Sequence, residues 1–68
     1  MDSGLGPIIQ SYLKEKGLSQ KYIAKQLGLT DSKLSAILQG KQQLKAEVYL
    51  AICEELDLSV NYFYDKLS

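Results

Sequence analysis

Apolar residues recur at intervals of three and four along most of the chain, and no segment alternates strictly between apolar and polar positions. The first spacing places apolar side chains along one face of a helix, whereas strict alternation would indicate a half-buried strand. The pattern therefore predicts an all-α fold. Residues typical of helix starts and ends divide the chain into five predicted helices, over about residues 6–16, 19–27, 31–39, 46–56 and 60–66.

Capping residues and glycines define the boundaries of these helices. Ser19 and Thr30 are the expected N-caps of the second and third helices, because their hydroxyls can accept a hydrogen bond from a backbone N–H of the first turn. Ser59 has the same place before the fifth helix. Gly28 is expected to end the second helix in the left-handed conformation, which glycine adopts without a steric cost. The second helix is therefore short and joined to the third by a tight turn.

The apolar positions of each helix predict the core. Cys53 lies on the apolar stripe of the fourth helix, so a buried, inert thiol is the expected state of the only cysteine. In the fifth helix one face carries Phe63 and Leu67, and another carries Val60 and Tyr64. The apolar positions of the first four helices are Leu5, Ile9, Tyr12, Tyr22, Ile23, Ala24, Leu27, Leu34, Ile37, Leu38, Tyr49, Ile52, Cys53 and Leu56.

Length and composition restrict the classes of function. A chain of 68 residues is expected to form one domain over residues 1–68, and so small a core favours regular helix packing or oligomerisation. With no histidine and one cysteine, the sequence predicts no disulfide within the chain, no metal site, no cofactor and no catalytic residues. No apolar run approaches the ~18 residues of a membrane span. We therefore expect a cytoplasmic protein that is neither an enzyme nor a membrane protein.

The charges are balanced in number but not in position. Eight lysines oppose eight acids, and there is no arginine. Residues 1–45 hold seven lysines and three acids, a net charge of +4, whereas residues 46–68 hold one lysine and five acids, a net charge of −4. This polarity indicates that the first two thirds of the chain meet an anion.

Two short helices separated by a glycine turn are typical of a helix-turn-helix, in which the second helix enters a DNA groove. From about Leu5 to Asp65 the sequence resembles the lambda-repressor/Cro-like (XRE-type) family. The order and spacing of five stretches carry the resemblance: residues 17–20 (Gly-Leu-Ser-Gln), 23–28 (Ile-Ala-Lys-Gln-Leu-Gly), Leu34, 39–41 (Gln-Gly-Lys) and 56–60 (Leu-Asp-Leu-Ser-Val). The resemblance implies a compact five-helix lambda-repressor-like domain, with the helix-turn-helix at helices two and three, that binds double-stranded DNA and regulates transcription.

The resemblance also implies which residues meet DNA. Gln20 matches a glutamine that contacts the DNA backbone and braces the reading helix. Asp31 has two readings, as a partner of the helix dipole or as an acceptor for cytosine N4. Because lysine lacks the bidentate fork of arginine, we expect modest affinity and strong salt dependence. The predicted DNA-binding residues are Gln20, Lys21, Thr30, Asp31, Ser32, Lys33, Ser35, Ala36 and Lys41, with Lys25 and Lys45 as further phosphate contacts.

The family often dimerises through its C-terminal region, so the resemblance favours a homodimer on a pseudo-palindromic operator. Val60 and Tyr64 are the predicted centre of a two-fold interface, with Leu58 or Tyr62 at its edge. The alternative is a protein–protein interaction module on the same scaffold, which the zero net charge and the missing arginine would also suit.

The sequence departs from the family at one pair of positions. Many members carry an arginine late in helix one and a glutamate before the turn that follows helix three, and these form a partly buried ion pair. Leu13 and Leu38 stand at those positions. Since packed aliphatic residues can replace a buried ion pair without loss of stability, we expect Leu13 and Leu38 to meet in the core and bridge helices one and three.

Overall fold

The computed structural model describes residues 4–67. Over this range the chain forms four α-helices and no strand: α1 (Leu5–Glu15), α2 (Gln20–Gln26), α3 (Asp31–Leu38) and α4 (Ala46–Leu56). A short 3₁₀ helix, η1 (Tyr64–Leu67), follows after a series of turns. The all-α class is confirmed for the described residues.

The predicted fifth α-helix over 60–66 is wrong. Residues 60–63 form turns, and only η1 is helical beyond α4. The carbonyl of Val60 accepts a hydrogen bond from the hydroxyl of Tyr49 on α4. The segment is also rich in aromatic and β-branched residues, which lower helix propensity. A tertiary contact therefore replaces the helix that the local pattern predicted.

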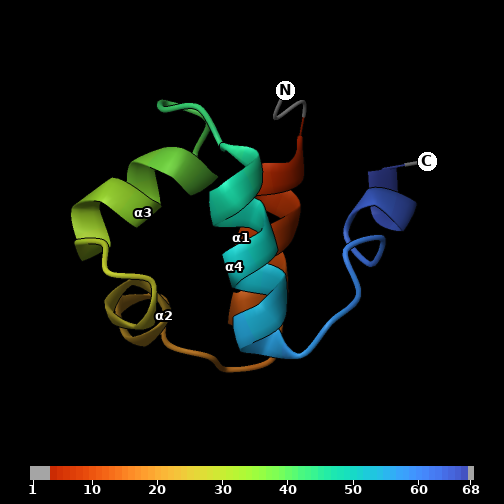
Figure 1. Cartoon of the computed structure of the whole chain (residues 1–68), viewed down its shortest axis with the longest axis horizontal. Helices are drawn as coiled ribbons and strands as arrows, with labels where there is room; N and C mark the ends of the chain where they lie inside the picture. Colours follow the sequence, from red (N-terminus) through yellow and green to blue (C-terminus); the bar gives the residue numbers. More distant parts are fainter. Residues whose placement is uncertain (1–3, 68) are drawn as a thin grey trace.

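In Figure 1, α4 lies in front of α1 near the centre of the view. On one side of this pair lie α2 and α3, and on the other side the C-terminal segment turns back toward η1. Contacts join α2 to α3, α1 to α3, α2 to α4 and α1 to η1. As a result, α2 and α3 form one edge of the molecule, and the C-terminal segment forms the opposite edge (Figure 1).

The predicted caps of α2 and α3 are confirmed. The Ser19 hydroxyl accepts from the N–H of Tyr22 at 3.1 Å, and the Thr30 hydroxyl accepts from the N–H of Lys33 at 3.0 Å. Gly28 has a φ of 76°, and the next N–H, from Leu29, donates to the α2 carbonyl of Ala24 at 2.9 Å. This hydrogen bond and the positive φ are those of a Schellman cap, which sets the direction in which the chain leaves α2 and enters α3.

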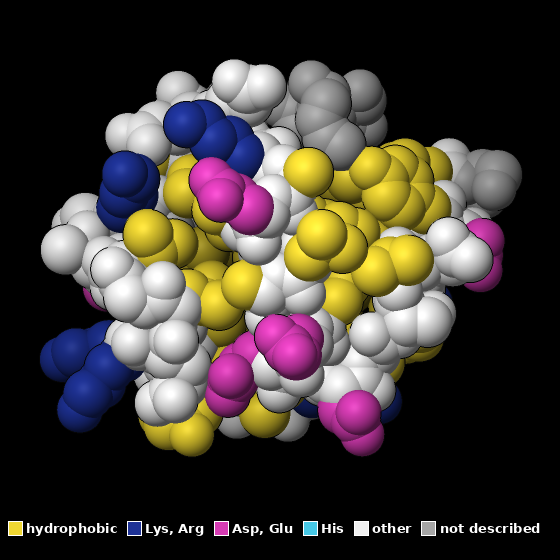
Figure 2. Space-filling model, in the orientation of Figure 1, with side chains coloured by type: hydrophobic (Ala, Val, Ile, Leu, Met, Phe, Trp, Pro, Cys, Tyr) yellow, Lys and Arg dark blue, Asp and Glu magenta, His cyan; other side chains and the backbone are white. Residues whose placement is uncertain are grey.

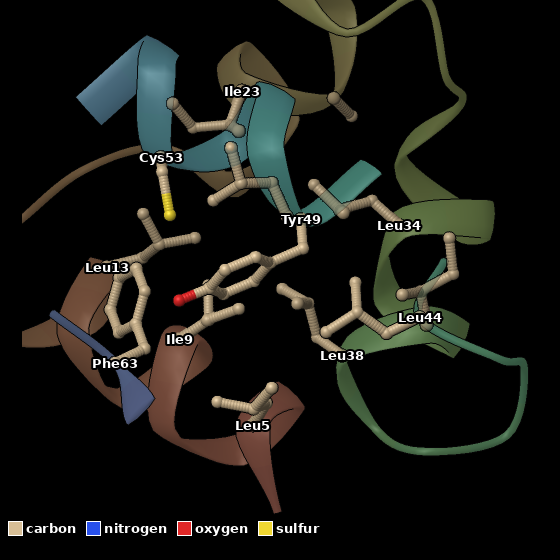
Figure 3. Close-up of a cluster of buried hydrophobic side chains, with 13 residues drawn as sticks. Leu5, Ile9, Leu13, Ile23, Leu34, Leu38, Leu44, Tyr49, Cys53 and Phe63 are labelled. Carbon is tan, nitrogen blue, oxygen red and sulfur yellow. The ribbon is translucent and has the colours of Figure 1, made fainter. Parts of the chain in front are cut away.

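The core is formed by apolar side chains from all four helices (Figure 3). Leu44, in the loop before α4, is fully buried although it lies outside the predicted helices. Tyr12, Leu27 and Leu56 pack against the core while remaining partly exposed, whereas Tyr22 and Leu67 are exposed at the surface although Leu67 shares a predicted face with the buried Phe63. The buried apolar residues are Leu5, Ile9, Leu13, Ile23, Ala24, Leu34, Ile37, Leu38, Leu44, Tyr49, Ile52, Cys53 and Phe63.

Leu13 and Leu38 both belong to this core, which confirms that the two positions are apolar and buried. Their direct contact stays a prediction. At Gly6, α1 approaches α3 tightly, since an added Cβ would lie 2.9 Å from the carbonyl carbon of Leu38. The two helices therefore meet backbone to backbone at this point.

Aromatic rings attach the C-terminal segment to the helices. Phe63 is fully buried and makes edge-to-face contacts with Tyr12 and Tyr49, at centroid distances of 5.5 and 6.3 Å. Burial, followed by hydrogen bonding to Cys53, raises the pKa of the Tyr49 phenol, which keeps it protonated as the donor to Val60. The turns after α4 are consequently held against α1 and α4.

Candidate nucleic-acid interface

The first three residues of α3 are exposed at the surface of the helix-turn-helix. Asp31, Ser32 and Lys33 are exposed, whereas Leu34 is fully buried one residue later. Ser35 and Ala36 are partly buried in the next turn. Because Leu34 and the two apolar residues that end α3 fix one face in the core, the first turn of the helix projects its polar side chains outward.

A chain of side-chain hydrogen bonds joins this first turn to α2 and α1. Gln20 Nε2 donates to Asp31 Oδ1 at 3.3 Å, and Gln10 Nε2 donates to Gln20 Oε1 at 3.3 Å. We call these three residues, Gln10, Gln20 and Asp31, the amide relay. Asp31 therefore has a hydrogen-bond donor within the protein while it also lies at the favourable N-terminal end of α3.

Two further predicted DNA-binding residues already make hydrogen bonds within the protein. The Thr30 hydroxyl oxygen is engaged as the N-cap of α3, and the Ser35 hydroxyl accepts from Gln39 Nε2 at 3.0 Å. A hydroxyl has one proton and two acceptor sites, so both groups retain a proton that can be donated. These contacts orient the two side chains without consuming their capacity to donate.

The lysines predicted to meet phosphate lie around the helix-turn-helix, and each is exposed: Lys21, Lys25, Lys33, Lys41 and Lys45. Figure 2 shows one face of the molecule, on which lysine side chains lie over the α2 and α3 side and near the start of α4. Acidic side chains on the same face lie mainly over α4 and the C-terminal segment (Figure 2). Lysines and acids are thus mostly apart on this face, although one acidic side chain lies next to the lysine near the start of α4 (Figure 2).

Lys33 and Lys45 are brought together by a depression between α3 and α4. Its volume is about 300 Å³, and Leu29, Ile37 and Val48 are among its apolar lining residues. Lys33 lies in the first turn of α3 and Lys45 is the residue before α4, so only the folded chain brings both to the same depression.

A larger cleft, with a volume of about 540 Å³, lies between α1 and the start of α2. Gln10, Lys14 and Gln20 line it together with Ser11. Gln10 and Lys14 were absent from the sequence-based prediction. Their spacing of four residues on a polar side of α1 was a visible signal, but their proximity to Gln20 depends on how α1 and α2 meet.

The predicted dimer residues differ in accessibility. Val60 and Tyr64 are 46% and 41% exposed, whereas Leu58 and Tyr62 are partly buried. The ring of Tyr62 packs edge-to-face on Tyr12 at 5.5 Å and lies 4.8 Å below the Lys66 ammonium. Tyr62 is therefore already engaged within its own chain.

An additional exposed apolar residue, Leu50, was missed because it lies off the core stripe of α4. It is 51% exposed and lines a shallow depression together with Leu58 and Val60. Figure 2 shows the hydrophobic side chains gathered between α4 and the C-terminal segment. The apolar surface thus extends from the C-terminal turns onto α4.

Residues 4–67 hold neither a metal-binding cluster nor a membrane-spanning helix. No group of three or more histidine, cysteine, aspartate or glutamate side chains there is placed to hold a metal ion. Within the same residues, every helix is too short or too polar to cross a membrane.

A short bracing helix, a glycine turn, and a second helix with an exposed polar N-terminus among lysines define a helix-turn-helix protein. The family model described as "Helix-turn-helix domain" matches residues 6–67. The chain belongs to this family. Comparisons with curated proteins and with solved structures found no match.

Proposed function

We propose that the protein binds double-stranded DNA sequence-specifically as a transcriptional regulator of the lambda-repressor/Cro-like type, with α3 in the major groove. The observation that carries the proposal is the exposed first turn of α3, which presents Asp31, Ser32 and Lys33 beside the lysines of α2. Helix-turn-helix proteins read base edges with this part of the second helix. The other proposed contacts are Gln20, Lys21, Thr30, Ser35, Ala36 and Lys41.

The division of labour among these residues follows from their chemistry. Lysines and Gln20 are proposed to hold the DNA backbone, which gives affinity without sequence preference. Ser32 and Ala36 are proposed to face base edges, where a hydroxyl donates or accepts and a methyl group contacts thymine. Asp31 accepts from the amino group of a base.

We further propose that two copies bind a pseudo-palindromic operator through a two-fold contact at the apolar surface of α4 and the C-terminal turns. Val60 and Tyr64 are its proposed centre, with Leu58 and Tyr62 at its edge. The exposed side chains of Leu50 and Val60 support this choice, because a small domain gains stability by covering such surface. Half-sites would then lie about 34–36 Å apart, one turn of the DNA helix.

The direct test is selection of binding sequences from randomised duplex DNA, followed by mobility-shift measurements at several salt concentrations. We expect an enriched sequence and an affinity that falls steeply as salt rises. The absence of binding to any duplex at low salt would reject the proposal and favour the protein-interaction module, for which the apolar surface around Leu50 would be the first face to examine.

A further inference from the structure

The amide relay links the exposed end of the reading helix to α1, a helix that carries none of the proposed DNA contacts. We propose that Gln10 is a specificity-positioning residue: it holds Gln20 so that Asp31 is presented to DNA as a hydrogen-bond acceptor. The base that faces Asp31 is then one that carries an amino group in the major groove, cytosine with N4 or adenine with N6, and not its pairing partner. This inference rests on the proposed DNA-binding function.

The direction of the relay is determined by Asp31. An ionised carboxylate only accepts hydrogen bonds, so Gln20 must turn its amide nitrogen toward Asp31 and its amide oxygen away. Gln10 donates to that oxygen from α1. In both hydrogen bonds of the relay the donor is on the α1 side and the acceptor is on the α3 side. These two bonds fix the orientation of the Gln20 amide, which an exposed glutamine without such partners would not have.

Asp31, at the α3 end of the relay, can still accept hydrogen bonds from DNA. A carboxylate has about four acceptor sites, and the hydrogen bond from Gln20 to Oδ1 uses one of them. The second N–H of Gln20 also remains for a phosphate oxygen. Thymine O4 and guanine O6 and N7 are acceptors only, so Asp31 would repel those edges while it accepts from an amino group.

The surroundings of Gln10 agree with a positioning role. Gln10 is partly buried, and it lines the 540 Å³ cleft with Gln20 and Lys14. Its amide nitrogen donates to Gln20, which joins α1 to the start of α2. Gln10 thus acts through Gln20 and Asp31 and needs no contact with a base.

Two substitutions of Gln10 separate positioning from structure. Q10M keeps the length of the side chain but removes the hydrogen bond, which leaves Gln20 free to move. Q10E can only accept, so it pulls the Gln20 nitrogen toward α1 and turns the Gln20 oxygen toward Asp31. The control is Q26E, which adds the same negative charge at an exposed position of α2 outside the relay.

The measurement compares two duplexes that differ only at the base pair whose preference changes in D31N. One carries the preferred cytosine or adenine and the other carries guanine. The wild type should favour the first by about 5–150-fold, the range expected for one good base contact. Q10E should bring the ratio of the two Kd values close to one and Q10M should give an intermediate ratio, while Q26E weakens both duplexes equally.

A second test reverses the direction of the hydrogen bonds in the amide relay. In the double variant Q10E/D31N, an asparagine amide can donate to the turned Gln20 oxygen, and Gln20 can donate to the new glutamate. We expect affinity above that of Q10E alone, without the original base preference. The melting temperature of each variant shows whether it still folds. If Q10E does not fold, the ratio of the two Kd values in Q10M is the test of the inference.

The outcomes distinguish the two proposals. If D31N changes base preference while Q10M and Q10E keep the wild-type ratio, Gln10 does not position the reading residue. If D31N leaves the preference at every base pair unchanged, Asp31 does not read DNA and the inference fails although DNA binding stands. If the wild type binds no duplex, the proposed function fails and the inference fails with it.

Discussion

The absence of a side chain at Gly6 allows α1 and α3 to pack closely where they meet. Gly6 lies in the first turn of α1, where alanine would ordinarily stabilise a helix. Here the added Cβ would meet the backbone of Leu38, which is part of α3 and cannot turn aside as a side chain can. Packing of the two helices therefore outweighs helix propensity at this position.

We expect G6A to lower the free energy of unfolding by about 1–3 kcal/mol, the usual cost of overpacking a core. Urea denaturation measures the change, and S11A, at an exposed position of α1, is the control, with an expected effect within about 0.5 kcal/mol. A G6A protein as stable as the wild type would mean that α1 and α3 are less closely packed than they are here.

Tyr49 makes stability depend on alkaline pH. Burial, with the hydrogen bond to Cys53, raises the pKa of its phenol above the ordinary value of about 10. The unfolded chain then loses this proton at a lower pH than the folded chain does. The stabilisation is fully present below about pH 10 and is lost as pH rises above it, by up to about 1.4 kcal/mol per pH unit.

The Y49F variant tests this dependence. Near pH 8 it should be less stable by about 1 kcal/mol, because the Val60 carbonyl loses its donor. Between pH 10 and 12 the difference from the wild type should shrink, since phenylalanine has no proton to lose. Denaturation curves at fixed pH values decide the matter, and a constant difference across this range would show that Tyr49 does not titrate as proposed.

At the scale of elements, local chemistry predicted most of the fold. The Ser19 and Thr30 caps and the left-handed Gly28 depend on residues within one turn, so the sequence was sufficient to place α2 and α3. The C-terminal helix was predicted wrongly. In that segment the Val60 carbonyl accepts a hydrogen bond from the hydroxyl of Tyr49, which lies eleven residues earlier in the sequence. Local pattern cannot register such a contact.

The same distinction applies to the candidate site. Exposure of the first turn of α3 follows from helical periodicity. The amide relay, in contrast, joins residues on three helices: Gln10 and Gln20 are ten positions apart in the sequence, and Gln20 and Asp31 are eleven apart. Gln10 is an ordinary polar residue in the sequence, and only the packing of α1 against α2 and α3 gives it a partner. Leu44 was missed for the same reason, because a loop residue has no periodicity.

Substitutions in the helix-turn-helix should affect DNA binding in two ways, according to whether the residue contacts phosphate or a base. K33A should weaken binding to all DNA sequences alike and lower the slope of log K against log salt by about one, because one phosphate contact is lost. S32A should instead alter the preference at one base pair by about 1–3 kcal/mol. Titrations of the selected and a scrambled duplex at several salt concentrations separate the two effects.

The control for these variants is K66A, because Lys66 packs over Tyr62 on the side of the molecule opposite α2 and α3. Its salt slope should equal that of the wild type. If neither K33A nor S32A changes binding to the selected duplex, α3 is not the reading element.

At the scale of the whole molecule, most of the lysines and most of the exposed apolar side chains lie at opposite edges. Five lysines lie in or next to α2 and α3, whereas four exposed apolar residues, Leu50, Val60, Tyr64 and Leu67, lie on α4 and the C-terminal segment. Tyr22 on α2 and Leu18 before it are exposed as well. A dimer joined at the second edge leaves the first edge of each copy free for DNA. Such a dimer would present two reading helices, as the proposed binding to successive major grooves requires.

We therefore expect association to depend on concentration and on Val60. V60E places a charge in the centre of the proposed interface and should give a monomer in sedimentation experiments at concentrations where the wild type associates. N61E is the matched control, because Asn61 is exposed and adjacent but polar, and it should associate nearly as the wild type does. On an operator with two half-sites, V60E should lose the advantage of paired binding yet keep its affinity for a single half-site. A wild type that stays monomeric at high micromolar concentration, and binds both operators like V60E, would assign the apolar surface to another partner.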